Sequence, residues 1–172
     1  METAGLNFNK DEIISIQWQE LGLTGEAIGE LTILKSWESS EKDILETFLP
    51  KIQSHPFNFI FVGKNLSFDF CFLSQRLKKY NLLEFDLAYL YNRIFIDLKP
   101  LLIIMNDGRV KDYHKIIPQT NPISNYQIPI LFKNEEYDKI LGYIKDEAND
   151  FIVAYQVFKK EVPLFRNKIR KA

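Results

Sequence analysis

The chain has 172 residues, of which 46% are hydrophobic and 26% charged, and its formal net charge at pH 7 is -1. These values predict one globular domain covering residues 1–172 and exclude a disordered chain. The near-neutral charge argues against an architectural DNA-binding protein, although an enzyme needs only a local basic strip to bind nucleic acid.

The cysteine and histidine content limits the metal chemistry. The single cysteine, Cys71, excludes an internal disulfide framework and a cysteine-cluster zinc site, and the chain has only two histidines. Any metal would therefore use oxygen ligands, which favours Mg²⁺ or Mn²⁺. We find no signal peptide and no apolar run near the ~20 residues of a spanning helix, so we expect a cytoplasmic protein without a membrane partner.

The chain opens with a pattern typical of an antiparallel hairpin. Glu12–Gln19 alternates, with Ile14, Ile16 and Trp18 on one face, and Glu30–Trp37 is the returning strand after a glycine-rich connection.

The middle of the chain predicts a helix, a strand and a second helix. Ser40 is the expected N-cap of a helix that ends before Pro56. The apolar run Phe57–Val62 predicts a short strand buried on both faces, and a second helix is expected to reach about Tyr80.

The second half predicts another strand, Tyr91–Asp97, and a short helix, Leu98–Ile104, which Asp97 would cap. Asn106–Pro129 predicts a functional or mobile loop. Asn134–Lys160 predicts a long amphipathic helix, followed by a basic tail that extends to Lys171. The predicted fold class is α/β, a mixed sheet with an antiparallel hairpin, flanked by helices.

One carboxylate stands out in this pattern. Asp69 begins the second helix and is flanked by Phe68, Phe70 and Phe72. An unpaired carboxylate is costly to bury, so Asp69 needs a cation, hydrogen-bond donors or solvent. We interpret it as a metal ligand, with an exposed helix residue as the alternative.

Three stretches of the sequence resemble motifs of one enzyme family. Near the start stands Glu2-Thr3-Ala4-Gly5-Leu6. The second stretch has Asn65, Phe68, Asp69, Phe72 and Leu73 in the pattern N-x-x-F-D-x-x-F-L, and the third is Tyr143-x-x-x-Glu147. Together they resemble the DnaQ-like 3′–5′ exonucleases of the ribonuclease H-like superfamily, whose motifs are D-x-E-T-x-G-L, N-x-x-F-D-x-x-F-L and Y-x-x-x-D. The resemblance is closest to the tyrosine-type branch, which includes YprB-like and family B polymerase-like proofreading domains.

The resemblance implies a ribonuclease H-like fold and two-metal hydrolysis at the 3′ end of single-stranded DNA or RNA. It implies Mg²⁺ or Mn²⁺ ligands at Glu2, Asp69 and either Glu147 or Asp150, with Asp146 as a further rival, and a water-positioning role for Tyr143. The substrate contacts that it implies are Thr3, Gly5, Leu6, Asn65, Phe68 and Phe72.

The sequence departs from the family pattern at two points. The aspartate of the first motif would stand one position before Met1, and the central strand that carries it is missing; Glu147 stands where the family has aspartate. We expect that the natural chain begins further upstream, and that without this strand the chain is less stable or forms a homodimer. The alternative is a catalytically degenerate nucleic-acid-binding or interaction module of the same fold. Tyr143 would then be an ordinary core aromatic, and the acidic residues of the last helix a solvated face.

Overall fold

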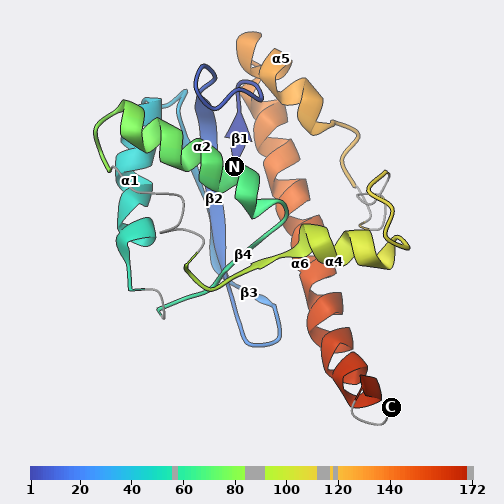
Figure 1. Cartoon of the computed structure of the whole chain (residues 1–172). Coiled ribbons are helices and arrows are strands. Elements are labelled where there is room, and N and C mark those ends of the chain that lie inside the picture. The colour runs from blue at the N-terminus through green and yellow to red at the C-terminus, as the bar shows by residue number, and fades with distance from the viewer. Residues whose placement is uncertain (56–57, 84–91, 112–116, 118–119, 170–172) are drawn as a thin grey trace.

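The computed structural model describes residues 1–55, 58–83, 92–111, 117 and 120–169, and predictions that fall on the other residues lie outside it. The described chain is mixed α/β, as predicted (Figure 1). Its strands are β1 (Glu2–Thr3), β2 (Ile13–Leu21), β3 (Ala27–Lys35), β4 (Phe61–Gly63) and β5 (Phe95–Asp97). Its helices are α1 (Glu41–Gln53), α2 (Leu66–Lys79), α4 (Leu98–Met105), the 3₁₀ turn η2 (Asn125–Gln127), α5 (Ile128–Lys133) and α6 (Tyr137–Ile169).

The strands form two small sheets. The first is antiparallel in the order β1-β2-β3, with Glu2 opposite Ser15, and it contains the predicted hairpin. The second is a parallel pair in which Gly63 of β4 lies opposite Asp97 of β5. The parallel pairing brings the turn after β4 next to the start of α4.

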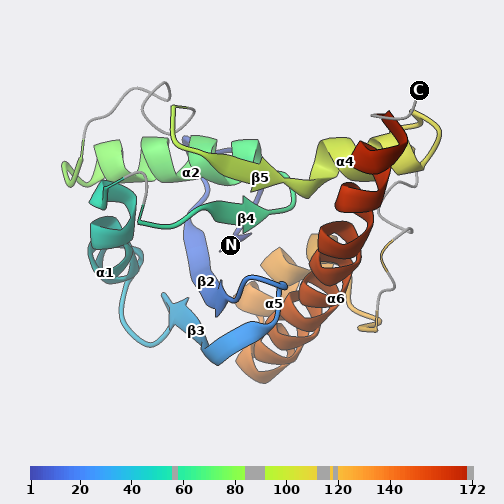
Figure 2. The same cartoon turned by 90° about the horizontal axis from the view of Figure 1, so that it is seen from below.

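The helices cover the antiparallel sheet from two sides. Seen from below, β2 and β3 lie between α1 on one side and α5 with α6 on the other (Figure 2). Strand β2 is consequently buried on both faces where it begins. Ile16 packs with the residues of α1 and α2, whereas Ile14 packs with Ile140, Tyr143 and their neighbours. The prediction of one common apolar face was therefore wrong for Ile14, which packs in a different cluster from Ile16 and Trp18. The register of β2 against β1 shifts at this point, since Glu2 lies opposite Ser15 and Thr3 opposite Ile13.

Strand β4 is shorter and less buried than predicted. Only Phe61–Gly63 is extended and paired, all three residues are half-buried, and Ile60 just before them is 49% exposed. The apolar run predicted a strand buried on both faces, whereas in this structure it belongs to a two-stranded sheet that offers little cover.

The predicted N-caps of two helices were confirmed, whereas the predicted extents of the later loop and of the last helix were wrong. The side chains of Ser40 and Asp97 accept backbone hydrogen bonds as the N-caps of α1 and α4. Helix α5 lies partly within the stretch predicted to be loop. Helix α6 continues to Ile169, so most of the predicted basic tail is helical.

A buried ion pair joins β2, α1 and α2. Arg76 donates to Glu41 from Nε to Oε1 at 2.7 Å and from Nη2 to Oε2 at 2.5 Å, and each side chain is 2% exposed. The same carboxylate accepts hydrogen bonds from the backbone N–H of Ile13 at 2.7 Å and from the Tyr80 hydroxyl at 2.9 Å. Four donated hydrogen bonds thus satisfy one buried anion, a condition that buried charges require.

We expect the substitution Glu41→Gln to destabilise the fold strongly. The amide still accepts from Ile13, but the buried Arg76 guanidinium loses its counter-charge, which costs about 3–5 kcal/mol. Urea unfolding followed by circular dichroism measures this loss. The matched control is Glu46→Gln, because the Glu46–Lys42 pair is half exposed and should change the free energy of unfolding by no more than about 0.5 kcal/mol. Equal midpoints for the two variants would contradict the assigned role of Glu41.

Candidate functional site

Glu2 is held at the edge of the antiparallel sheet by the pairing of β1 with β2. Its side chain is 7% exposed, and its Oε1 accepts a hydrogen bond from Gln17 Nε2 at 3.2 Å. A residue at the start of a chain is ordinarily loose. Here the strand pairing and Gln17 fix the carboxylate in the interior.

The turn between β4 and α2 is built around Asn65. Asn65 adopts a left-handed conformation with φ of 68°, which asparagine tolerates better than most residues. Its backbone N–H donates to Asp97 Oδ1 at 2.8 Å, and its side-chain Oδ1 accepts from Lys99 Nζ at 2.8 Å. These bonds tie the turn to the start of α4 and so set the direction of α2, which carries Asp69 in its first turn.

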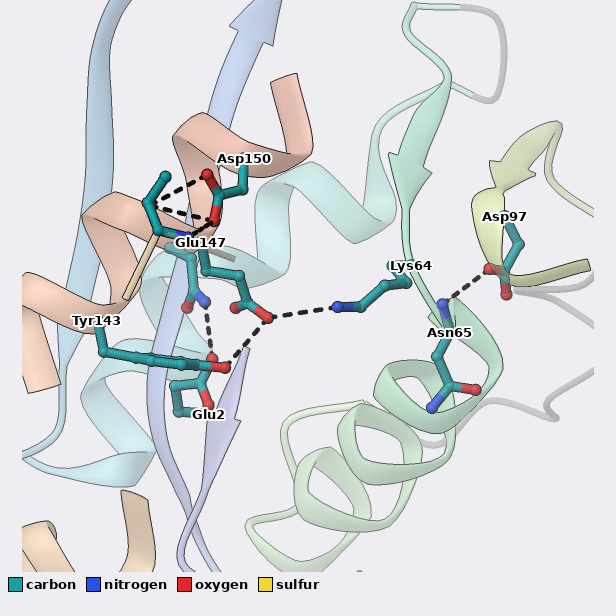
Figure 3. Close-up of polar contacts among 9 residues, drawn as sticks. Glu2, Lys64, Asn65, Asp97, Tyr143, Glu147 and Asp150 are labelled. Atoms are coloured by element: carbon teal, nitrogen blue, oxygen red, sulfur yellow. Dashed lines mark hydrogen bonds and ion pairs between the residues drawn. The ribbon is translucent and has the colours of Figure 1, made fainter. Parts of the chain in front are cut away.

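Helix α6 contributes Tyr143 and Glu147, which lie one helical turn apart. The Tyr143 hydroxyl donates to Glu147 Oε1 at 3.2 Å, and Lys64 Nζ lies 3.7 Å from the same oxygen (Figure 3). In this view Glu2 lies beside the Tyr143 ring, and Glu147 points away from α6 toward Lys64. Side chains from β1, the β4–α2 turn and α6 therefore meet in one place.

Three carboxylates interact electrostatically across this region. Burial raises the pKa of Glu2 to about 7, and the charges of Glu147 and Asp69 add to the rise, while the amino group of Met1 and the Gln17 hydrogen bond oppose it. Burial likewise raises the pKa of Asp69 to about 6, with contributions from Glu147 and Asp97 and opposition from the same amino group. Glu2 is buried, whereas Asp69 and Glu147 are partly buried. Carboxylates that repel one another and have raised pKa values are typical of functional sites.

The Tyr143 phenol and the Met1 amino group both stay protonated at neutral pH, because the pKa of each is raised. Burial raises the pKa of the Tyr143 phenol above its ordinary value, and the charges of Glu147 and Glu2 raise it further. The pKa of the Met1 amino group is also raised; burial by itself would lower it, but Asp69, Glu2 and Glu147 outweigh burial. Tyr143 is therefore a neutral hydrogen-bond donor and cannot act as a base.

The chemistry of the donor set fits a hard cation, although its spacing does not form a finished cage. Carboxylate oxygens are the ligands of Mg²⁺ and Mn²⁺. Among the described residues, however, no three His, Cys, Asp or Glu side chains are gathered closely enough to form a metal-binding group. Glu2, Asp69 and Glu147 would hold a cation only after a shift, and Glu147 is engaged by Lys64 in this structure.

The other acidic candidates on α6 face a different segment. Asp150 accepts hydrogen bonds from the backbone N–H and the hydroxyl of Thr120 at 3.0 and 3.1 Å, and in Figure 3 it points away from Glu2 and Lys64. Asp146 accepts from Asn121 Nδ2 at 2.5 Å. Both residues anchor the chain before α5, and Glu147 is the acidic residue of α6 that lies with Glu2.

The expected contact residues of the first motif form a tight turn. Thr3 Oγ1 donates to the carbonyl of Gly5 at 2.6 Å. A Cβ on Gly5 would lie 2.2 Å from the Asp11 carboxylate, which accepts from the Asn7 backbone N–H, so a larger residue here would displace that carboxylate. Leu6 is 71% exposed at the tip of the turn.

The expected aromatic contacts differ in their access to the surface. Phe72 is fully buried in the core, and its ring packs against Phe68 at 5.0 Å and Phe8 at 6.0 Å between centroids. Phe68 is half-buried and Phe8 is 38% exposed. A ligand would therefore meet Phe68 and Phe8, with Phe72 supporting them from beneath.

Two site residues were missed by sequence reasoning. Gln17 donates to Glu2, and Lys64 pairs with Glu147. Gln17 carries no signal beyond its alternation on β2. Lys64 could have been identified from the sequence, because it directly precedes Asn65 in the second motif and is therefore close to Asp69 in the chain.

Comparisons of the chain with protein-family models and with curated proteins found no match. In the part of the chain that the structure describes, no helix is long and apolar enough to cross a membrane.

We expect the raised pKa values to make stability fall as the pH rises from 4 to 7. The ordinary pKa values are 3.8 for Asp69 and 4.5 for Glu2, so in this window the folded protein binds more protons than the unfolded chain. Asp69→Asn removes the cost of ionising Asp69 in the folded protein, so this variant should be more stable than the parent above pH 7 by roughly 1–3 kcal/mol. The two stabilities should converge near pH 4.

Urea unfolding at a series of pH values measures this difference. Glu20→Gln, at an exposed position on β2, is the control and should parallel the parent at every pH. If Asp69→Asn is less stable than the parent above pH 7, the ionised Asp69 stabilises the folded protein, which would contradict the prediction.

Proposed function

We propose that this protein is a metal-dependent nuclease domain with a ribonuclease H-like arrangement that trims single-stranded nucleic acid from the 3′ end. The observation that carries the proposal is electrostatic: the charges of Glu2, Asp69 and Glu147, each from a different element, influence one another, and Glu147 accepts a hydrogen bond from the Tyr143 hydroxyl. The three motifs that resemble DnaQ-like exonucleases contribute these same four residues.

Each of these residues has a chemical role under this proposal. Glu2, Asp69 and Glu147 would hold Mg²⁺ or Mn²⁺, which when bound would stabilise the charge on the attacking and leaving oxygens of a phosphodiester. The neutral Tyr143 hydroxyl would orient a water molecule toward the scissile phosphate, since its raised pKa prevents it from removing a proton. Half-buried Phe68 and exposed Leu6 would contact the terminal bases.

The test is degradation of 5′-labelled single-stranded DNA and RNA in the presence of Mn²⁺. The protein carries its purification tag at the C-terminus, so that Glu2 keeps its surroundings. We expect products shortened stepwise from the 3′ end. Asp69→Asn should reduce the rate by at least about 100-fold, since loss of even an outer partner of a metal ligand costs about 10- to 100-fold.

A second pair of variants tests which acidic residue of α6 belongs to the site. Glu147→Gln should lose activity with Asp69→Asn, whereas Asp150→Asn should retain most of it, because Asp150 is bound to Thr120. Equal rates for the parent and Asp69→Asn would refute the site. Loss of activity in Asp150→Asn alone would transfer the ligand role to Asp150.

A second candidate function is a catalytically degenerate module that binds single-stranded nucleic acid without cleaving it. The observations that favour it are the Lys64–Glu147 ion pair and the lack of a ready metal-binding group among the described residues. It predicts fluorescence-anisotropy binding of labelled oligonucleotides that is equal with EDTA and with Mn²⁺. Cleavage that depends on Mn²⁺ and on Asp69 would exclude it.

A further inference from the structure

Lys64 occupies a fixed place at the edge of the acidic site. It belongs to the turn between β4 and α2, whose backbone is held by the bond from the Asn65 N–H to Asp97. Its ammonium lies 3.7 Å from Glu147 Oε1, and the side chains of the pair are 30% and 36% exposed. The turn therefore presents a cation to the acidic residue of α6 without burying either partner.

The partner of Lys64, Glu147, is coupled to the other two carboxylates. Glu147 is near enough to Glu2 and Asp69 to raise the pKa of each of them. The buried Met1 amino group is the positive charge that acts on Glu2 and Asp69, whereas the Lys64 ammonium is paired with Glu147. The ammonium of Lys64 approaches Glu147 Oε1, the same oxygen that accepts the hydrogen bond from the Tyr143 hydroxyl.

We propose that Lys64 is an internal counter-ion which competes with a divalent metal for Glu147, so that metal binding at this site requires the Lys64–Glu147 pair to open. This inference rests on the proposed function, because it assumes that Glu147 is a metal ligand. Two features of the pair support it. The ammonium is on a long flexible side chain with a solvent-exposed part, so it can leave Glu147. Glu147 also keeps its Tyr143 hydrogen bond when Lys64 leaves, so the carboxylate stays oriented.

The competition makes Lys64 a positioning residue with a measurable signature. While the pair is closed, the ammonium neutralises part of the acidic group and lowers its attraction for Mn²⁺. Replacing Lys64 with a neutral side chain should therefore tighten Mn²⁺ binding, whereas a purely structural lysine would leave the affinity unchanged or weaken it. The expected gain is about five-fold, the size set by a half-exposed ion pair.

The experiment measures Mn²⁺ affinity by electron paramagnetic resonance on the full chain, without nucleic acid. Lys64→Gln should bind Mn²⁺ about five-fold more tightly than the parent. Lys64→Arg keeps the charge and should bind like the parent. Lys99→Gln is the matched control: it removes a positive charge from a neighbouring lysine that contacts Asn65 rather than Glu147, and it should change the affinity by less than about two-fold.

The variants separate this inference from the proposed function. Glu147→Gln combined with Lys64→Gln should bind no more tightly than Glu147→Gln alone, because the competition acts through Glu147. If Asp69→Asn abolishes Mn²⁺ binding but Lys64→Gln leaves it unchanged, the metal site stands and the counter-ion role of Lys64 is refuted. If neither the parent nor any variant binds Mn²⁺, both the metal site and the role of Lys64 are refuted.

Discussion

The buried pair of Glu41 and Arg76 is the constraint on which the position of α2 depends. The Glu41 carboxylate holds β2 through the Ile13 N–H and holds α2 through Arg76 and Tyr80. Asp69 lies seven residues before Arg76, so the two side chains project from nearly the same face of α2. The Arg76 guanidinium is paired with Glu41, whereas the partly buried Asp69 has a raised pKa because burial and the charges of Glu147 and Asp97 outweigh the Met1 amino group. One face of α2 thus carries Arg76, whose charge is paired and stabilises the fold, and Asp69, whose ionised form is disfavoured. Asp69 is therefore the better candidate for function.

Much of the local structure could be predicted from the sequence, because its causes are local. Ser40 and Asp97 precede helices and accept their first N–H groups, which needs no knowledge of the rest of the chain. The two-sided burial of the start of β2 could not be predicted, since it depends on where α1 and α6 pack. The same is true of Phe72, which has the same sequence pattern as Phe68 and is distinguished from it only by burial.

The candidate site was predictable in its members and not in its contacts. The motif spacing identified Glu2, Asp69, Tyr143 and Glu147 as candidates. In the structure the charges of the carboxylates raise one another's pKa values and that of Tyr143. The sequence could not indicate that Lys64 would pair with Glu147, because the two are far apart in the chain and their meeting depends on how the β4–α2 turn faces α6. Opposite charges meet here because the mutual repulsion of the carboxylates makes a nearby cation favourable.

The choice among the three acidic candidates on α6, Asp146, Glu147 and Asp150, follows from helical geometry. Residues four apart share a face, so Glu147 lies over Tyr143 and its carboxylate reaches the phenol hydrogen, while Asp146 and Asp150 share a face of their own. That second face meets Thr120 and Asn121, and the first meets Glu2 and Lys64. A rotation of roughly 100° per residue therefore separates a face that anchors the preceding segment from one that completes the acidic site. The four-residue spacing of Tyr143 and Glu147 has a physical reason of its own: in a helix, it lets a buried phenol orient a carboxylate from one turn away.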